Sequence, residues 1–211
     1  MKKGFTRQNF SKKNLVGFTL LELLIVIGIL AILSTTMILV INPAQLLKKA
    51  RDSQRISDLN TMKTAIAYYV TNYSSPVIGA IDKTYSDVSG AVCDAKADGS
   101  TSTASTVDGN GWLPIDFTDL TEGSPIGALP RDPAQTASGA DPARYYVYLV
   151  ASATNYTFQL VANMESSYYS NGGPGDVEQY DGGTIATLYE VGTANTTLAT
   201  TSANCYLGSG Q

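Results

Sequence analysis

In this 211-residue chain the stretch from Phe18 to Ile41 reads FTLLELLIVIGILAILSTTMILVI. Its 24 residues contain a single charged side chain, that of Glu22. A helix of this length, at roughly 1.5 Å per residue, exceeds the hydrocarbon thickness of a bilayer, which is about 30 Å. The stretch therefore predicts a helix over residues 18–42 that resides in a membrane.

The charges around the apolar stretch predict its orientation. Five bases and no acid precede it: Lys2, Lys3, Arg7, Lys12 and Lys13. The positive-inside rule places residues 1–17 in the cytoplasm and the chain after about residue 42 outside it. A secretory signal peptide is disfavoured, because its apolar part spans about 7–15 residues and precedes a small-x-small site. Two interpretations stay open: a plain anchor with Glu22 reaching the interface, or a helix in which Glu22 needs a partner.

Composition excludes several classes of chemistry. The chain has no histidine, which rules out histidine triads, histidine general bases and histidine-ligated metals. Its two cysteines cannot supply the four thiolates of a structural zinc site. After Pro76 four bases face 15 of the 18 acids, and such an acidic surface argues against direct nucleic-acid binding. We therefore expect a scaffold without enzymatic activity.

The residues around Gly17 form a recognisable junction. Lys12 and Lys13 precede the segment Gly17-Phe18-Thr19-Leu20-Leu21-Glu22, and the apolar stretch follows without interruption. This junction resembles the class III signal of type IV pilins and of type II secretion pseudopilins. The resemblance implies that a prepilin peptidase cleaves after Gly17 at the cytoplasmic face. It also implies that Phe18 becomes N-methylated and that the apolar helix stays in the mature protein.

A role for Glu22 follows from the charge that cleavage creates. The new ammonium group of Phe18 would be buried among apolar helices in a stack of subunits. Losing one member of a buried ion pair costs about 3–5 kcal/mol, so an unpaired ammonium is strongly disfavoured. We expect Glu22 to neutralise the Phe18 amine of an adjacent subunit during assembly.

Residues 43–73 continue the helix as an amphipathic half, after an interruption that Pro43 predicts at residues 39–43. The apolar positions recur at spacings of three and four: Ile56, Leu59, Met62, Ile66, Tyr69, Val70 and Tyr73. The opposite face is predicted to carry Lys48, Lys49, Arg51, Asp52, Arg55, Asp58 and Lys63. This basic stretch is either a solvated face or a collar that meets the acidic region of a neighbouring subunit.

Residues 74–143 are rich in Gly, Ser, Thr, Asp and Pro, and they predict a long connecting loop. The tract 97–111 is the part expected to lack order. The buried anchors of the loop 74–143 are predicted to be Trp112, Leu113, Ile115 and Phe117. The segment Leu129–Pro133, LPRDP, resembles the segment that precedes the sheet in major pseudopilins, and its two prolines predict a rigid approach to the first strand.

Residues 144–211 are predicted to hold the sheet and the C-terminal segment. Strands are expected at 144–152, 156–165 and 184–191, the first two joined as a hairpin. Three strands against one helix predict an α+β fold of the pilin type, in which the second half of the long helix packs on a small antiparallel sheet. The clustered tyrosines are expected to serve packing and hydrogen bonding, with an aromatic ligand platform as the alternative.

Two further features are left with open alternatives. Asp176, Glu178 and Asp181 lie in a glycine-rich loop and form either a calcium site or an acidic surface turn. Cys93 and Cys205, if exported, are expected to pair as a disulfide, with two separate buried thiols as the alternative.

The family resemblance predicts a structural subunit of a surface filament. Its partners would be further copies of the chain, a prepilin peptidase, an assembly platform and the membrane, with nucleic acid bound only through an assembled filament. The single-pass precursor would sit in the cytoplasmic membrane before it joins an extracellular filament. The alternatives are a type II secretion pseudopilin, a membrane-tethered binding domain that never polymerises, and a carboxylate enzyme such as a glycosidase.

Overall fold

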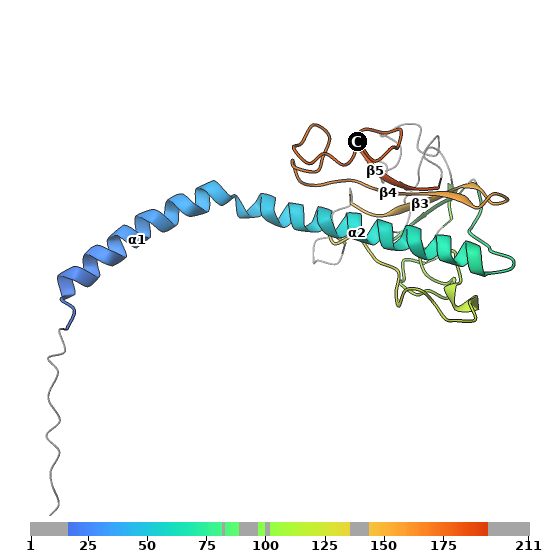
Figure 1. Cartoon of the computed structure of the whole chain (residues 1–211), viewed down its shortest axis with the longest axis horizontal. Helices are drawn as coiled ribbons and strands as arrows, with labels where there is room; N and C mark the ends of the chain where they lie inside the picture. The colour runs from blue at the N-terminus through green and yellow to red at the C-terminus, as the bar shows by residue number, and fades with distance from the viewer. Residues whose placement is uncertain (1–16, 82, 89–96, 100–101, 136–143, 194–211) are drawn as a thin grey trace, which may run out of the picture. The chain divides into compact units, whose positions relative to one another are not determined.

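The structure, a computed structural model, describes residues 17–81, 83–88, 97–99, 102–135 and 144–193. It divides into two compact units, residues 1–43 and 44–211, each of which is described by itself. The predicted leader up to residue 16 lies outside the described residues, and so does the predicted disulfide between Cys93 and Cys205. The fold is α+β, with an apolar N-terminal helix and a sheet (Figure 1).

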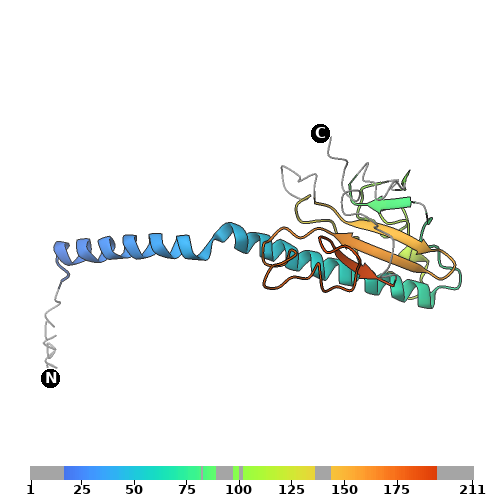
Figure 2. The same ribbon diagram turned by 90° about the horizontal axis from the view of Figure 1, so that it is seen from above.

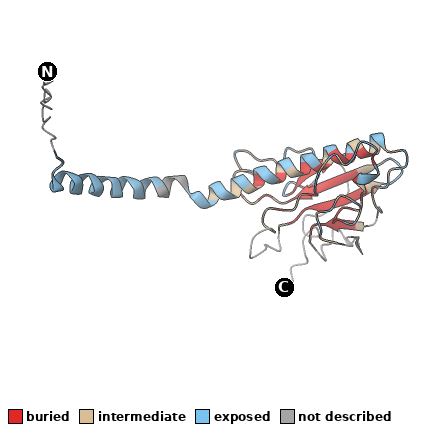
Figure 3. Cartoon of the chain, turned by 90° about the horizontal axis from the view of Figure 1, so that it is seen from below, coloured by how far each residue is buried: buried red, intermediate tan, exposed pale blue. Residues whose placement is uncertain are grey.

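Helix α1 (Leu20–Ile41) is apolar around its whole circumference. The Thr19 hydroxyl caps it by accepting a hydrogen bond of 3.2 Å from the backbone amide of Glu22. All side chains described in this helix, from Leu20 to Met37, are exposed, as Figure 3 shows. The window Leu20–Met37 has a mean hydropathy of 2.4 and is long enough to cross a membrane, a property that signal sequences share. A helix that is apolar all round needs an apolar environment.

The interruption predicted at residues 39–43 is confirmed, and it separates two helices. Helix α1 ends at Ile41, and α2 (Pro43–Asn72) begins after one residue, Asn42. Asn42 has a φ of 45°, in the left-handed region that asparagine tolerates at helix ends. Pro43 then occupies the first helical position, where its missing amide hydrogen costs no helical hydrogen bond.

Among the described residues, the sheet of the second unit has five strands in the order β2-β1-β3-β4-β5. The strands are β1 (Lys83–Ser86), β2 (Ala97–Asp98), β3 (Val147–Ser152), β4 (Thr157–Ala162) and β5 (Tyr189–Gly192). Four of them pair antiparallel, and β2 joins the edge of β1 in parallel. Figure 2 shows α2 running beside β3 and β4.

Both faces of the sheet are buried, which explains why β3 reads as a continuous apolar run. Tyr148, Val150, Phe158 and Leu160 belong to the main core together with Leu59, Met62, Ile66 and Tyr69 of α2. Tyr145, Val147, Leu149, Val161, Ile185 and Leu188 form a second cluster. The second half of the predicted long helix thus packs on the sheet as expected.

The loop between helix and sheet is well anchored. Trp112, Leu113, Ile115 and Phe117 are fully buried, which confirms the predicted anchors. The indole Nε1 of Trp112 donates a hydrogen bond of 3.0 Å to the carbonyl of Pro130.

Two predictions for this loop fail for the residues that the structure describes. Strands β1 and β2 and a 3₁₀ helix, η1 (Phe117–Asp119), lie inside the segment 74–143, so the sheet has five strands where three were predicted. In the tract that was expected to lack order, backbone hydrogen bonds hold residues 102–111 in place. The carbonyls of Ala104, Ser105 and Val107 accept amide hydrogen bonds from Trp112, Leu129 and Phe117 at 2.9, 2.8 and 2.8 Å. These long-range bonds leave no trace in local composition.

The predicted strands were too long, and the third was misplaced at its start. Strands β3 and β4 lie within the predicted ranges 144–152 and 156–165. Strand β5 begins only at Tyr189, because the amides of Thr184 and Ile185 instead donate to the carboxylate of Glu190 at 2.7 and 2.9 Å.

Candidate functional site

The residues predicted for processing and assembly lie at the start of α1. Gly17 and Phe18 precede the helix outside regular secondary structure, and Phe18 is 78% exposed. A Cβ added at Gly17 would meet no atom within 4 Å, so the backbone around Gly17 is open to approach. Glu22 lies three residues after the cap Thr19 and is also exposed.

Thr19 and Glu22 occupy the first and last positions of the pattern S/T-x-x-E, the capping box. The Glu22 amide satisfies its hydrogen bond through the Thr19 hydroxyl. A carboxylate in the first helical turn also interacts favourably with the helix dipole. The position of Glu22 therefore suits two roles, helix initiation and pairing with a cation, and a substitution must separate them.

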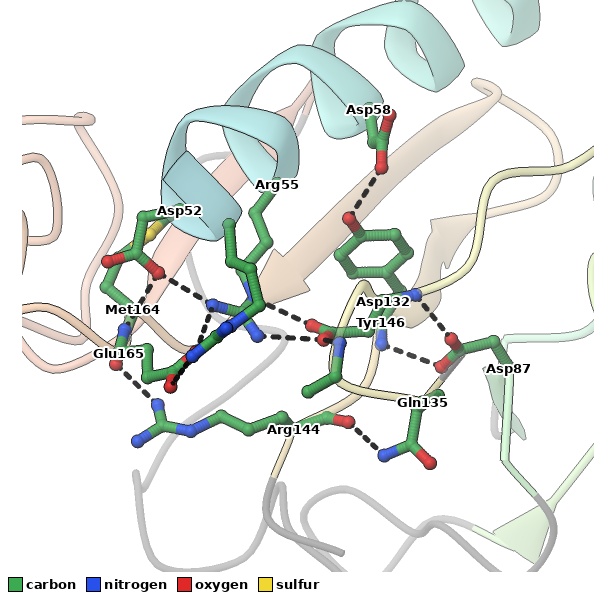
Figure 4. A network of polar contacts seen from close by, with 12 residues as sticks. Asp52, Arg55, Asp58, Asp87, Asp132, Gln135, Arg144, Tyr146, Met164 and Glu165 are labelled. Atoms are coloured by element: carbon green, nitrogen blue, oxygen red, sulfur yellow. Dashed lines mark hydrogen bonds and ion pairs between the residues drawn. The ribbon is translucent and has the colours of Figure 1, made fainter. Parts of the chain in front are cut away.

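The second unit contains a group of ionic side chains that the sequence did not predict, here called the ionic cluster: Arg51, Asp52, Arg55, Asp132 and Glu165. Figure 4 labels all of them except Arg51. Arg55 of α2 is at its centre and is fully buried. Its Nε donates to Asp132 Oδ2 at 2.7 Å, and its Nη2 donates to Asp132 Oδ1 at 2.8 Å. Its Nη1 donates to Asp52 Oδ1 at 2.7 Å. These three bonds join one helix turn to the Leu129–Pro133 segment.

Asp52 fixes the segment after β4. Its two carboxylate oxygens accept hydrogen bonds from the amides of Glu165 and Ser166, at 2.8 and 2.7 Å. The carboxylate of Glu165 turns back to pair with Arg51. The hydrogen bond from Arg51, together with its charge, lowers the pKa of Glu165 to about 2 despite partial burial. Burial lowers the pKa of Arg55, but the carboxylates of Asp132 and Asp52 raise it by more, so Arg55 stays charged.

Asp87 extends this network to the sheet. It follows β1, is fully buried, and accepts hydrogen bonds of 2.8 Å from the amides of Asp132 and Tyr146. Burial raises the pKa of Asp87 to about 6, and these two amide bonds oppose the rise. Through Asp132 and Asp87, therefore, α2, the Leu129–Pro133 segment, β1 and the start of β3 share one chain of polar contacts.

The prediction of a solvated basic face on α2 is wrong for two of its members. Asp52 and Arg55 are fully buried, and both pair inside their own chain. Apart from Ala65, the buried positions of α2 are 52, 55, 59, 62, 66 and 69, with spacings of three and four. Residues 55 and 52 lie one and two helical turns before Leu59. Extending the apolar pattern from Leu59 toward the N-terminus would therefore have placed both charged residues on the core face.

The Leu129–Pro133 segment has a different role from the predicted one. It was expected to lead into the first strand, but β1 and β2 precede it in the chain. Its Leu129 side chain is buried, and its Asp132 carboxylate receives Arg55. Two prolines flank Arg131 and Asp132, which limits the backbone and holds the carboxylate in place.

The structure does not bring the predicted calcium ligands together. Asp176 accepts hydrogen bonds from the amides of Gly172 and Gln179, at 2.7 and 3.0 Å. Glu178 is buried and accepts from the amides of Met164 and Asn171, at 3.0 and 2.9 Å. Asp181 accepts from the amides of Gly183 and Glu190. Among the described residues no group of three acidic, histidine or cysteine side chains is placed to hold a metal ion.

Several tyrosines play the predicted part in packing and hydrogen bonding. The hydroxyl of Tyr146 donates to Asp58 Oδ2, and that of Tyr148 donates to the carbonyl of Ile78, both at 2.8 Å. Asn60 Nδ2 donates to the hydroxyl of Tyr189 at 3.2 Å. These rings cross-link α2, the loop and the sheet.

A groove of about 420 Å³ lies between α2 and the loop at residues 125–126. It is lined by Ser57, Asn60, Thr61, Thr64, Ala65, Pro125 and Ile126. None of these side chains is a carboxylate, so the groove lacks the pair of acids that the glycosidase alternative requires.

Comparison of the chain with protein-family models, with curated proteins and with solved structures finds no match. Its function must therefore be inferred from its own residues.

Proposed function

We propose that this chain is a structural subunit of a type IV pilus-like surface filament, processed after Gly17 and polymerised through α1. The observation that carries the proposal is the combination of the Gly17–Glu22 junction with a 22-residue apolar helix whose described side chains are all exposed. Exposed apolar surface on this scale marks a site of association with lipid or with other proteins.

The helix would serve in two environments one after the other. In the precursor its apolar side chains face lipid, and the helix is long enough to span the hydrocarbon core. In a filament the same side chains would pack against the α1 helices of neighbouring copies, where they are again removed from water. A single surface thus supports both the storage of subunits in the membrane and their polymerisation.

Glu22 would guide this assembly. It is the only ionisable side chain between Phe18 and Ile41, so it is the only one in α1 that could neutralise a buried amine. The interaction of one Glu22 with the Phe18 amine of the next subunit would fix the axial register of the stack.

The second unit suits a part that must withstand exposure outside the cell. Its helix α2, its Leu129–Pro133 segment and its sheet are tied together by the ionic cluster as well as by an apolar core. Nothing in the proposal requires an active site in this unit.

Electron microscopy of material sheared from cells tests the proposal, with two matched glycine variants. Gly17→Val should block processing and abolish filaments. Gly127→Val introduces the same side chain at an exposed loop position where an added Cβ meets nothing within 4 Å, and it should leave filaments intact. Filaments that persist in Gly17→Val cells at the wild-type level would refute the proposal.

A second candidate function is that of a pseudopilin of a type II secretion system. The Leu129–Pro133 segment favours it through its resemblance to major pseudopilins, and the burial of Leu129 and Asp132 supports a structural role for this segment. Deletion of the gene separates the two functions. A pilus subunit predicts loss of long surface filaments with normal protein export, whereas a pseudopilin predicts accumulation of secreted proteins inside the cell envelope.

A further inference from the structure

The first turns of α2 expose apolar side chains that the second unit does not cover. Leu46 and Leu47 are 58% and 61% exposed. The next large apolar side chain that is similarly exposed, in chain order among the described residues, is Val77. Ile81 and Tyr180 are also exposed in the second unit, whereas within α2 the large exposed apolar side chains are Leu46 and Leu47, at the end that follows α1 in the chain.

The two residues that follow carry positive charge without an acidic partner. The ion pairs of the described residues involve Arg51 and Arg55 but neither Lys48 nor Lys49. The Nζ atom of Lys49 lies 3.5 Å from the ring centroid of Tyr168, a cation–π contact that leaves the charge unneutralised. Lys48, Lys49 and Tyr168 are all partly exposed.

Chain connectivity limits how far these residues can lie from the end of α1. Leu46 follows Ile41 by five residues, which span at most about 18 Å when fully extended. Helix α1 has 22 residues, about 33 Å of helix, and this length already matches the hydrocarbon core. When α1 spans a bilayer, Leu46 and Leu47 are not needed for the crossing and must lie close to the interface.

We propose that Leu46, Leu47, Lys48, Lys49 and Tyr168 dock on a bilayer containing anionic phospholipid, and we call them the docking surface. Residues 46–49 are consecutive on α2, so their side chains form a ring around the helix end that faces the bilayer from all sides of its axis. The leucines would enter the boundary between acyl chains and headgroups, as apolar side chains of interfacial helices do. The lysines would meet lipid phosphates, and the tyrosine would lie at headgroup level. The docking surface requires that α1 spans a membrane, and it is independent of cleavage and polymerisation.

Tryptophan fluorescence of the full chain in lipid nanodiscs tests the docking surface. In Leu47→Trp the new indole should be quenched when the lipids carry brominated acyl chains. Ala67→Trp is the matched control, because residue 67 is exposed on the same helix and lies about 30 Å further along it. The native Trp112 is fully buried and supplies a constant background in both variants. We expect strong quenching at residue 47 and none at residue 67.

The headgroup is tested by comparing phosphatidylcholine discs with discs that also contain phosphatidylglycerol. In the anionic discs each lysine should raise the ratio of docked to undocked chains about fivefold. The double variant Lys48→Gln, Lys49→Gln should therefore lower this ratio about 25-fold. Lys63→Gln removes one positive charge about 22 Å along α2, as each single lysine substitution does, and should have no effect.

Two results would overturn the proposal. An unquenched indole in Leu47→Trp chains that remain bound to the discs would show that α1 is inserted but the docking surface is not engaged. Headgroup recognition would be refuted if the quenching had the same strength with and without phosphatidylglycerol, and with and without the lysine substitutions. Neither result depends on processing after Gly17, so the filament proposal is tested separately.

Discussion

Arg55 holds Asp132 through two parallel hydrogen bonds, 2.7 Å from Nε to Oδ2 and 2.8 Å from Nη2 to Oδ1, and both side chains are inaccessible to solvent. The two residues are 77 positions apart in the sequence. This bidentate geometry is specific to arginine and a carboxylate, so it selects one placement of the Leu129–Pro133 segment on α2.

Removing one partner of this pair should destabilise the second unit severely. Asp132→Asn is expected to lower the free energy of unfolding by about 3–5 kcal/mol, because it leaves the Arg55 guanidinium buried with less compensation. Chemical denaturation of the detergent-solubilised chain, followed through the fluorescence of the buried Trp112, measures the change.

Arg51→Gln is the control for this measurement. It breaks the neighbouring pair with Glu165, but the Arg51 side chain is 35% exposed, so its loss should cost no more than about 1 kcal/mol. Equal effects of the two substitutions would contradict the distinction between a buried and a partly exposed pair.

The second unit should be more stable near pH 4.5 than at pH 7. The folded state raises the pKa of Asp87 to about 6, so it binds more protons than the unfolded state between roughly pH 4 and pH 6. Stability from Asp87 is therefore lost as pH rises through this window, by about 3 kcal/mol in total. Burial also raises the pKa of Asp58, Glu178, Asp181 and Glu190, which acts in the same direction.

Below about pH 4.5 the dependence of stability on pH has the opposite sign, so stability falls as pH falls. The pKa of Glu165 is lowered to about 2, so its stabilising contribution is present above about pH 4.5 and is lost as pH falls toward 2. Asp87→Asn should flatten the change between pH 4 and 6, and Glu165→Gln should flatten the change below pH 4.5. A denaturation midpoint that rises steadily from pH 4.5 to pH 7 would contradict this interpretation.

The orientation of the precursor should be only marginally determined. Five leader bases compete with four bases within 15 residues after α1, which are Lys48, Lys49, Arg51 and Arg55. Substitution of Lys12 and Lys13 by glutamine leaves three against four, and a fraction of the chains should then insert in the inverted orientation. Reporter fusions after residue 81 measure this fraction. Uniform insertion in the wild-type orientation would show that the leader charge does not determine the topology.

The two roles of Glu22 should separate in a set of three substitutions. Glu22→Gln keeps a residue suited to the capping box but removes the charge, so it should reduce filament yield as much as Glu22→Ala does. A loss of 3–5 kcal/mol corresponds to a reduction of about 10²- to 4 × 10³-fold. Thr19→Ala removes only the cap, at about 1 kcal/mol, and should change the yield by about fivefold or less. Wild-type yield in Glu22→Gln would assign Glu22 to helix initiation alone.

The sequence predicted those parts of the fold that depend on local pattern. The apolar run, the break near Pro43 and the hairpin of β3 and β4 each follow from residues adjacent in the chain. The anchors around Trp112 were also found, because large apolar side chains within a polar loop have few alternatives to burial.

What the sequence did not predict depends on long-range contacts. Strands β1 and β2 have four and two residues and acquire their conformation from the partners that the sheet provides. Arg55 and Asp52 were assigned to solvent because charged side chains are seldom fully buried, and their acceptors and donors lie 77 and 113 positions away. The sequence left a calcium site and an acidic surface turn open for the loop carboxylates, and in the structure each of them accepts hydrogen bonds from backbone amides.

The filament-subunit proposal is tested most directly by the mass of the N-terminal peptide of the mature protein recovered from the cell surface. We predict a peptide that begins at Phe18 and carries one added methyl group on its amine. Recovery of a surface-exposed chain in which Gly17 is still joined to Phe18 would contradict the proposal.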